Sequence, residues 1–175
     1  MVTIGIDLKG YIRSIPNWPK KGILFRDITP LLAEPKAFAA AIDALCADFI
    51  DAGIEYVAAV EARGFIFGSA VAEKLGAGFV PIRKKGKLPY KTETVTYDLE
   101  YGTDTLEVHK DAISKGSKVL MVDDLLATGG TMAAACKLIK KIGGQIAGVS
   151  FLIELSDLAG RNKLGDYKVN VVISC

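Results

Sequence analysis

Apolar residues along the chain fall into short runs that are separated by longer stretches of mixed character. Short, mostly apolar runs are typical of strands buried on both faces, and they lie at 57–60, 79–82, 119–122, 148–153 and 169–173. Between several of these runs, apolar residues recur every three or four positions, which predicts helices over 35–52, 64–75 and 129–142. This alternation predicts an α/β fold with a mainly parallel central sheet flanked by helices.

Other segments add detail to this scheme. The pattern predicts an amphipathic helix over 3–14, a proline-rich turn over 16–22 and a short helix over 157–164. Between Arg83 and His109, β-favouring residues alternate with polar ones instead of forming an apolar run. That alternation is clearest at 94–97 and 105–108, and it predicts an exposed antiparallel hairpin.

Composition and charge narrow the class of protein. The chain has 175 residues, half of them hydrophobic, so we expect a single domain over 1–175 with a sizeable core and not a disordered segment. The 22 Lys and Arg residues exceed the 20 Asp and Glu residues by two, which argues against non-specific nucleic-acid binding.

The sequence also bears on the compartment. No apolar stretch approaches the roughly 20 residues of a membrane-spanning helix. The first residues show no leader pattern, so we expect a cytoplasmic protein without a membrane partner. Cys46, Cys136 and Cys175 are too widely spaced for a zinc site or a redox pair, and we expect reduced thiols.

The segment that follows the run 119–122 is the most informative about chemistry. Asp123 and Asp124 come at the carboxyl end of a predicted strand, where open α/β sheets bind ligands. Neighbouring carboxylates readily accept hydrogen bonds from two ribose hydroxyls. The next residues combine glycines, two hydroxyls and a helix start, as a backbone cradle for phosphate requires: Ala127, Thr128, Gly129, Gly130 and Thr131. The sequence therefore predicts a site for a ribose 5-phosphate group.

This segment also has a simpler interpretation. A strand that ends in two acids before a glycine-containing helix start is also typical of a simple turn with an N-cap. Other phosphate motifs are absent, since the chain has no GxxxxGK[ST] and no GxGxxG after a predicted strand. P-loop NTPases, kinases and nicotinamide dehydrogenases are thereby disfavoured. The only histidine, His109, falls in the predicted hairpin, which disfavours a histidine-based catalytic triad.

Five ordered motifs resemble those of the type I phosphoribosyltransferases, whose signature is four apolar residues, two acids and a TG-containing loop. The motifs are FRDITP at 25–30, EARGF at 61–65, RKKGKLP at 83–89, LEYG at 99–102 and VDDLLATGGT at 122–131. In the branch of the family that uses hypoxanthine and guanine, an Asp precedes the Thr-Gly pair and a Lys stands at the second glycine. This chain has Ala127 and Gly130 at those positions, so the resemblance favours adenine as the base.

The resemblance implies a reaction of purine salvage. Ribose 5-phosphate would pass from 5-phosphoribosyl 1-pyrophosphate (PRPP) to N9 of adenine, giving AMP and pyrophosphate. Mg²⁺ would be required and would bind mainly through the substrate and water, with no dedicated metal ligands in the protein. The resemblance further implies the type I phosphoribosyltransferase fold, with a small base-binding hood over 1–34, a mobile hairpin lid over 83–109, and a homodimer.

The resemblance also implies which residues bind the substrates and which take part in catalysis and lid closure. Asp123, Asp124 and the loop 127–131 would bind the ribose and its 5′-phosphate. The residues expected at pyrophosphate are Arg63, Arg83, Lys84 and Lys87. Those expected at adenine are Leu24, Phe25, Arg26, Leu125 and Leu155. Glu100 would be the catalytic residue, managing a proton at the purine, and Tyr101 would shape the closed lid.

Two further functions stay open at this point. One is a regulator with the same fold that binds PRPP, catalyses nothing and acts on nucleic acid. The other is a transferase for xanthine or another purine. The cations between Arg83 and Lys91 are also open to interpretation as a solvated loop or a non-specific RNA contact.

Overall fold

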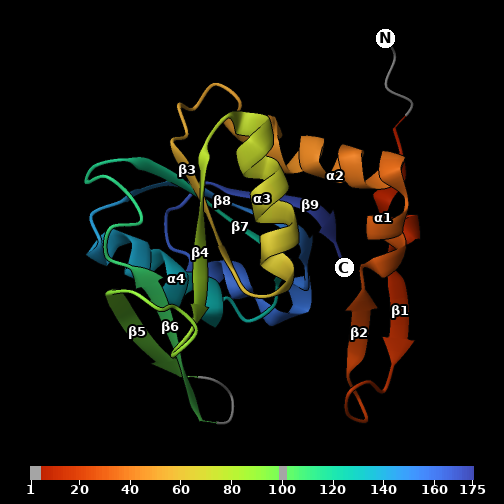
Figure 1. Ribbon diagram of the computed structural model, residues 1–175. Helices are drawn as coiled ribbons and strands as arrows, with labels where there is room; N and C mark the ends of the chain where they lie inside the picture. Colours follow the sequence, from red (N-terminus) through yellow and green to blue (C-terminus); the bar gives the residue numbers. More distant parts are fainter. Residues whose placement is uncertain (1–4, 99–101) are drawn as a thin grey trace. The chain divides into compact units, whose positions relative to one another are not determined.

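The computed structural model describes residues 5–98 and 102–175, and these residues form two compact units that divide between Ala44 and Leu45 (Figure 1). In the first unit, a two-stranded antiparallel sheet pairs Ile15 with Phe25. The elements there are η1 (Leu8–Tyr11), β1 (Arg13–Pro16), β2 (Leu24–Asp27), α1 (Thr29–Ala33) and all but the last two residues of α2 (Pro35–Cys46), where η denotes a 3-10 helix.

The helix predicted over 3–14 is wrong within the described residues. Asp7 caps a single 3-10 turn, in which Lys9 N–H donates to Asp7 Oδ1 over 3.1 Å, and the chain then continues as β1. Gly10 disfavours a longer helix, and the residues that follow it gain backbone hydrogen bonds by pairing with β2. The helix predicted over 35–52 ends at Cys46 and is followed by a 3-10 turn, η2 (Ala47–Phe49).

The second unit is built on a seven-stranded sheet in the order β5-β6-β4-β3-β7-β8-β9, which confirms the predicted α/β class. The parallel strands are β3 (Tyr56–Val60), β4 (Gly78–Lys84), β7 (Lys118–Leu126), β8 (Gln145–Glu154) and β9 (Val169–Ser174). The antiparallel hairpin is β5 (Thr92–Asp98) with β6 (Thr103–His109). The other elements are α3 (Arg63–Leu75), α4 (Gly130–Lys141), η3 (Ser156–Leu158) and η4 (Gly160–Lys163).

The two helices of this unit explain why the central strands are apolar throughout. Helix α3 packs against β3, β4 and β7, while α4 packs against β5, β6, β7 and β8. Side chains alternate along each strand, so Met121 joins the core under α4, and Ala59 lies against Gly68 of α3. All four residues of the run 119–122 have a relative exposure of 0%, as burial on both faces requires.

Three details differ from the sequence-based expectations. Strand β7 continues to Leu126 because it keeps pairing with β8, so Asp123 and Asp124 lie inside the strand and not after it. The short helix predicted over 157–164 is two 3-10 turns, interrupted by Ala159 at φ 49°.

The third difference concerns the exposure of the hairpin. The antiparallel pairing is confirmed, but Leu106, Glu107 and Val108 are buried, at 1%, 4% and 0% exposure. Strand β6 is buried there because it joins the central sheet through β4. No helix within 5–98 or 102–175 is long and apolar enough to cross a membrane.

Candidate active site

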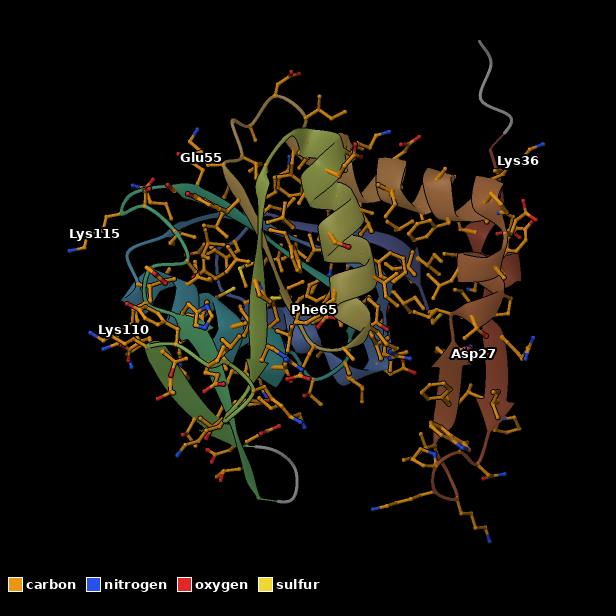
Figure 2. The ribbon with its side chains drawn as sticks, viewed as in Figure 1. Asp27, Lys36, Glu55, Phe65, Lys110 and Lys115 are labelled. Atoms are coloured by element: carbon orange, nitrogen blue, oxygen red, sulfur yellow. The ribbon has the colours of Figure 1, made fainter. Side chains whose placement is uncertain are left out.

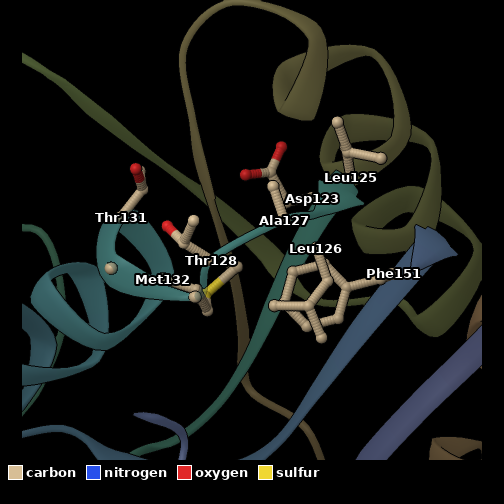
Figure 3. A pocket seen from close by; sticks show the side chains of 10 residues that line it. Asp123, Leu125, Leu126, Ala127, Thr128, Thr131, Met132 and Phe151 are labelled. Carbon is tan, nitrogen blue, oxygen red and sulfur yellow. The ribbon is translucent and has the colours of Figure 1, made fainter. Parts of the chain in front are cut away.

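A pocket of about 110 Å³ lies at the carboxyl end of β7, where the sequence predicts ribose 5-phosphate (Figure 3). Its lining consists of Asp123, Leu125, Leu126, Ala127, Thr128, Gly129, Gly130, Thr131, Met132 and Phe151. Figure 3 shows the carboxylate of Asp123 on the same side of the pocket as the hydroxyls of Thr128 and Thr131, with Leu126 and Phe151 packed together beneath. The pocket therefore combines an apolar floor with a polar rim.

The loop 127–130 is shaped to present backbone N–H groups. Gly129 is the N-cap residue of α4 and has φ 78°, a left-handed conformation that glycine adopts without steric cost. Helix α4 has no acidic residue in its first turn, so its unsatisfied N–H groups and the positive end of its dipole are open to an anion. This geometry suits the phosphate cradle that the sequence predicts.

Asp123 and Asp124 differ in their contacts. Asp123 lines the pocket and accepts a hydrogen bond from the backbone N–H of Asp124 over 2.9 Å. Asp124 is 5% exposed and forms an ion pair with Arg63, whose Nε lies 2.8 Å from Asp124 Oδ2.

Burial raises the pKa of Asp123, and the neighbouring charge of Asp124 raises it further. Burial also raises the pKa of Asp124, against the opposing effect of Arg63. Such a pair gains stability from hydroxyl donors or a cation brought by a ligand.

The start of α3 comes unusually close to this pair. A Cβ atom on Gly64 would lie 2.7 Å from Asp123 Oδ1, closer than real Cβ contacts come. Only glycine therefore lets the helix approach the carboxylate. The peptide bond between Glu61 and Ala62, just before α3, is cis.

The predicted pyrophosphate cations lie on two segments. Arg63 is at the start of α3, whereas Arg83, Lys84 and Lys87 lie at the end of β4 and in the turn after it. Arg83 Nη2 is 3.3 Å from Glu61 Oε2, and the backbone N–H of Lys84 donates to Glu61 Oε1 over 2.7 Å.

These contacts shift the pKa values of Glu61 and Lys84. Partial burial alone would raise the pKa of Glu61, but the hydrogen bonds from Lys84 and Arg83 outweigh it and the pKa is lowered. Asp104 lies 3.1 Å from Lys84 Nζ and raises the pKa of that amine. Three predicted cations, Arg63, Arg83 and Lys84, thus have carboxylate partners in this structure.

Glu107 organises the cationic turn, and sequence reasoning missed it. The backbone N–H groups of Lys87 and Leu88 both donate to Glu107 Oε1, each over 2.8 Å, from the turn to the middle of β6. Arg83 Nη1 donates to the carbonyl of Lys87 over 3.3 Å, which closes the same turn. In the sequence Glu107 is one more polar residue in an alternating strand, so no pattern marks it.

The hairpin also contacts the phosphate cradle. The hydroxyls of Tyr97 on β5 and Thr131 on α4 lie 3.3 Å apart. Tyr97 was another residue that sequence analysis did not single out. The contact joins a strand of the predicted lid to the loop that the lid is expected to cover.

The remaining predicted residues lie in several places. Leu155 follows β8, and its N–H donates to the carbonyl of Leu126 over 2.9 Å at the same edge of the sheet as the pocket. Leu24, Phe25 and Arg26 are in β2 of the first unit, where the ring of Phe25 lies 4.4 Å from that of Trp18. Glu100 and Tyr101 lie outside the described residues.

Among residues 5–98 and 102–175, no group of three or more His, Cys, Asp or Glu side chains is arranged to hold a metal ion. The nearby carboxylates are a pair at the end of a strand, with one member bound to Arg63. This donor set suits an ion held mostly by a ligand's own oxygens and by water, not a metal cage of the protein.

Comparisons with known proteins agree with this geometry. Residues 31–173 match the family model "Phosphoribosyl transferase domain". The chain is 56% identical over 169 residues to the adenine phosphoribosyltransferase of Pseudothermotoga lettingae, which covers 97% of this chain and 99% of the relative.

Solved structures give the same result. The adenine phosphoribosyltransferase of Rhodothermus marinus matches with a TM-score of 0.92 and 49% identity over 96% of both chains. The Saccharomyces cerevisiae enzyme, solved with an imino-altritol bisphosphate and adenine, matches with a TM-score of 0.89 and 43% identity over 94% of this chain and 96% of that one. The chain therefore belongs to the phosphoribosyltransferase family, in the group of the adenine phosphoribosyltransferases.

Proposed function

We propose that this protein transfers ribose 5-phosphate from PRPP to N9 of adenine, forming AMP and pyrophosphate in purine salvage. The observation that carries the proposal is the single pocket in which Asp123 faces the hydroxyls of Thr128 and Thr131, with Gly129 opening α4 beside them. The relatives named adenine phosphoribosyltransferase support the same activity, as does the Saccharomyces cerevisiae structure that holds adenine.

The pocket suits the sugar phosphate for a simple electrostatic reason. The Asp123 carboxylate accepts hydrogen bonds from ribose hydroxyls, and Asp124 keeps Arg63 beside it. The amides of the loop 127–130 and the start of α4 bind the 5′-phosphate. Together these groups hold the ribose by both ends, which fixes C1 for attack by the base.

Arg63, Arg83, Lys84 and Lys87 are the groups we propose for pyrophosphate. Bond breaking at C1 builds positive charge on the ribose ring and negative charge on the leaving group, so fixed cations lower the barrier. In this structure three of the four contact carboxylates: Arg63 contacts Asp124, Arg83 contacts Glu61 and Lys84 contacts Asp104. Pyrophosphate would therefore compete with these carboxylates for the cations.

The hairpin is proposed to act as a lid. Closing it over PRPP would keep water from capturing the oxocarbenium-like ribose. Glu100, at its tip in the sequence, is proposed to manage a proton at the purine, and Tyr101 to shape the closed site. Their support is the resemblance of LEYG at 99–102 to the family motif.

Adenine is proposed as the base on two positions of the phosphate loop. Ala127 lines the pocket where the 6-oxopurine branch carries an Asp, and Gly130 takes the place of a Lys. A methyl group at position 127 offers no hydrogen bond to purine N7, so the feature that handles 6-oxopurines is missing.

Mg²⁺ is proposed as the required ion. When bound, it would neutralise charge on the pyrophosphate leaving group. The residues nearest to such a role are Asp123 and Asp124, in contact through ribose hydroxyls and water. We expect EDTA to abolish AMP formation and added Mg²⁺ to restore it, while the melting temperature without substrate stays unchanged. Activity that persists in EDTA would contradict this role.

One assay tests the function. Purified protein is incubated with Mg²⁺, PRPP and adenine, hypoxanthine, guanine or xanthine in turn, and nucleotide formation is measured. We expect AMP from adenine and little product from the other bases. Preferential turnover of a 6-oxopurine would contradict the base assignment, and PRPP binding without any turnover would favour the regulator. The homodimer stays an expectation from the family resemblance, which analytical ultracentrifugation tests, and the cytoplasmic location stays a prediction from the sequence.

A further inference from the structure

The predicted phosphate loop, residues 127–131, packs against η4, a segment that belongs to none of the sequence motifs. Gly160, the first residue of η4, packs backbone to backbone against the loop, close to Ala127 and Gly129. A Cβ atom on Gly160 would collide with the carbonyl oxygen of Ala127, and one on Gly129 would collide with the carbonyl oxygen of Gly160. The loop and η4 therefore fit only as a glycine pair, and a shift of either one must move the other.

A partly buried ion pair lies directly beside Gly160. Its neighbour Arg161 donates from Nε to Glu154 Oε1 over 2.7 Å and from Nη2 to Glu154 Oε2 over 2.8 Å. Glu154 ends β8, and its side chain is 8% exposed. A two-pronged contact of this kind fixes the orientation of both side chains as well as their distance.

The rest of the segment is tied down independently of the ion pair. Ser156 N–H donates to the carbonyl of Cys175 over 2.9 Å, and the side chain of Leu164 is 2% exposed. Between these anchors, Ala159 adopts φ 49°, a conformation that is uncommon outside glycine. The Glu154–Arg161 pair is thus a side-chain contact that acts on the residue next to Gly160.

We propose that Arg161 is a positioning residue for PRPP: through its contact with Glu154 it presses Gly160 against the loop 127–130 and so fixes the backbone amides that bind the 5′-phosphate. The inference rests on the proposed function, because it concerns the same phosphate. Arg161 itself does not line the pocket, so its effect reaches the ligand only through the backbone.

The test compares binding of AMP, which carries the 5′-phosphate, with binding of adenosine, which lacks it. Dissociation constants of AMP and adenosine are measured by calorimetry for the wild type and for Arg161→Gln, together with KM for PRPP and for adenine. Because a small misplacement of binding groups is costly, we expect Arg161→Gln to weaken AMP binding and to raise KM for PRPP about tenfold. Adenosine binding and KM for adenine should change less than about twofold, since Leu155 has its own backbone contact.

Matched variants show whether Glu154 and Arg161 act together through their shared contact. Asn162→Ala, an exposed neighbour of Arg161, should leave all four constants unchanged. Arg161→Lys keeps the charge but loses the two-pronged contact, so its constants should fall between those of the wild type and Arg161→Gln. The double variant Glu154→Gln/Arg161→Gln should be no worse than Arg161→Gln alone, since both changes remove the same contact.

Each outcome has a definite meaning. Equal losses of AMP and adenosine binding, or a lower melting temperature with the AMP-to-adenosine affinity ratio unchanged, would overturn the positioning role. If Arg161→Gln does not fold, Arg161→Lys applies the same test, with the AMP-to-adenosine affinity ratio expected to fall. A wild-type protein that binds AMP no better than adenosine would instead contradict the proposed function, which keeps the two failures apart.

Discussion

The end of β7 and the hairpin β5–β6 both carry predicted site residues, yet they are attached to the protein in opposite ways. Strand β7 pairs with β3 on one side and β8 on the other, and its register with β8 continues past Asp123 to Leu126. The hairpin joins the sheet through β6 alone, and only Arg83 and Lys84 of β4 pair with it. Strand β5 is one of the two edge strands of the sheet, and β9 is the other.

The side chains reflect this difference. At the end of β7, the buried Asp124 and the half-buried Asp123 lie against the start of α3, with no spare space at Gly64. Along the hairpin, burial is confined to the middle of β6, and Asp98 and Thr103 at its outer end are exposed. Figure 2 shows where the two regions lie, with Phe65 labelled on α3 and Lys110 labelled after the end of β6. Under the proposed function, we expect ground-state binding at the end of β7 and closure at the hairpin, which is less extensively paired within the sheet.

The largest effect is expected at the end of β7. Asp123→Asn/Asp124→Asn removes the charge that accepts ribose hydroxyls, and losing two charge-assisted hydrogen bonds should lower AMP formation on the order of 10²–10⁴-fold. The fold should persist because Asn keeps the size and shape of the Asp side chain. AMP formation is measured with radiolabelled adenine, and circular dichroism checks the fold. Asp48→Asn/Asp51→Asn, at exposed positions, is the matched control, and undiminished activity of the first variant would refute the ribose assignment.

A second effect should come from the hairpin. Glu100→Gln is expected to lower kcat by roughly 10²-fold, as loss of a proton-transfer group typically does, with a smaller change in KM for adenine. Steady-state kinetics with varied adenine checks this expectation. Glu73→Gln, an exposed residue of α3, should behave as the wild type. A variant that changes only KM would show that Glu100 binds substrate without taking part in turnover.

A third pair of changes distinguishes function from stability on one helix. Gly64→Ala puts a methyl group 2.7 Å from Asp123 Oδ1, whereas Gly68→Ala puts one 2.6 Å from the Cβ of Ala59 in the core. Both should destabilise the fold by about 1–3 kcal/mol, as overpacking does. Only Gly64→Ala should also raise KM for PRPP. Thermal denaturation and kinetics measure the two effects, and equal kinetic losses in both variants would show that Gly64 has no special relation to Asp123.

The smallest effect should come from the contact between the two regions. Tyr97→Phe removes a hydroxyl that lies 3.3 Å from Thr131 Oγ1, a long hydrogen bond between partly exposed groups. We expect less than about 1 kcal/mol of stability and a change in KM for PRPP of a few-fold at most. Tyr90→Phe, in an exposed ring, is the control. A tenfold loss in Tyr97→Phe alone would mean that hairpin and cradle act as one rigid body.

Sequence patterns predicted the parallel sheet well because burial on both faces leaves a strong apolar signal, as in the runs 57–60 and 119–122. The same rule placed the end of β7 too early, since Asp123 and Asp124 keep their backbone pairing while their side chains serve the pocket. The helix expected over 3–14 failed because pairing with β2 outweighed a weak periodicity.

In the candidate site, too, sequence patterns identified some residues and missed others. The residues 127–131 are contiguous, so their motif brought Asp123 and the loop together in one pocket, although their roles stay predictions. Glu107 and Gly160 act through contacts with residues about twenty and thirty positions away in the chain, and no local pattern encodes such a contact. Only the folded arrangement shows what these residues do.

The two hydrogen bonds that Glu107 accepts from the turn after β4 have an evolutionary consequence. Because its carboxylate holds the main chain at Lys87 and Leu88, the path of the turn does not depend on which side chains project from it. Natural variation can then redistribute positive charge along this stretch without remodelling it. Divergent descendants of this sequence should accordingly preserve an acid at position 107 more faithfully than any individual lysine in the turn.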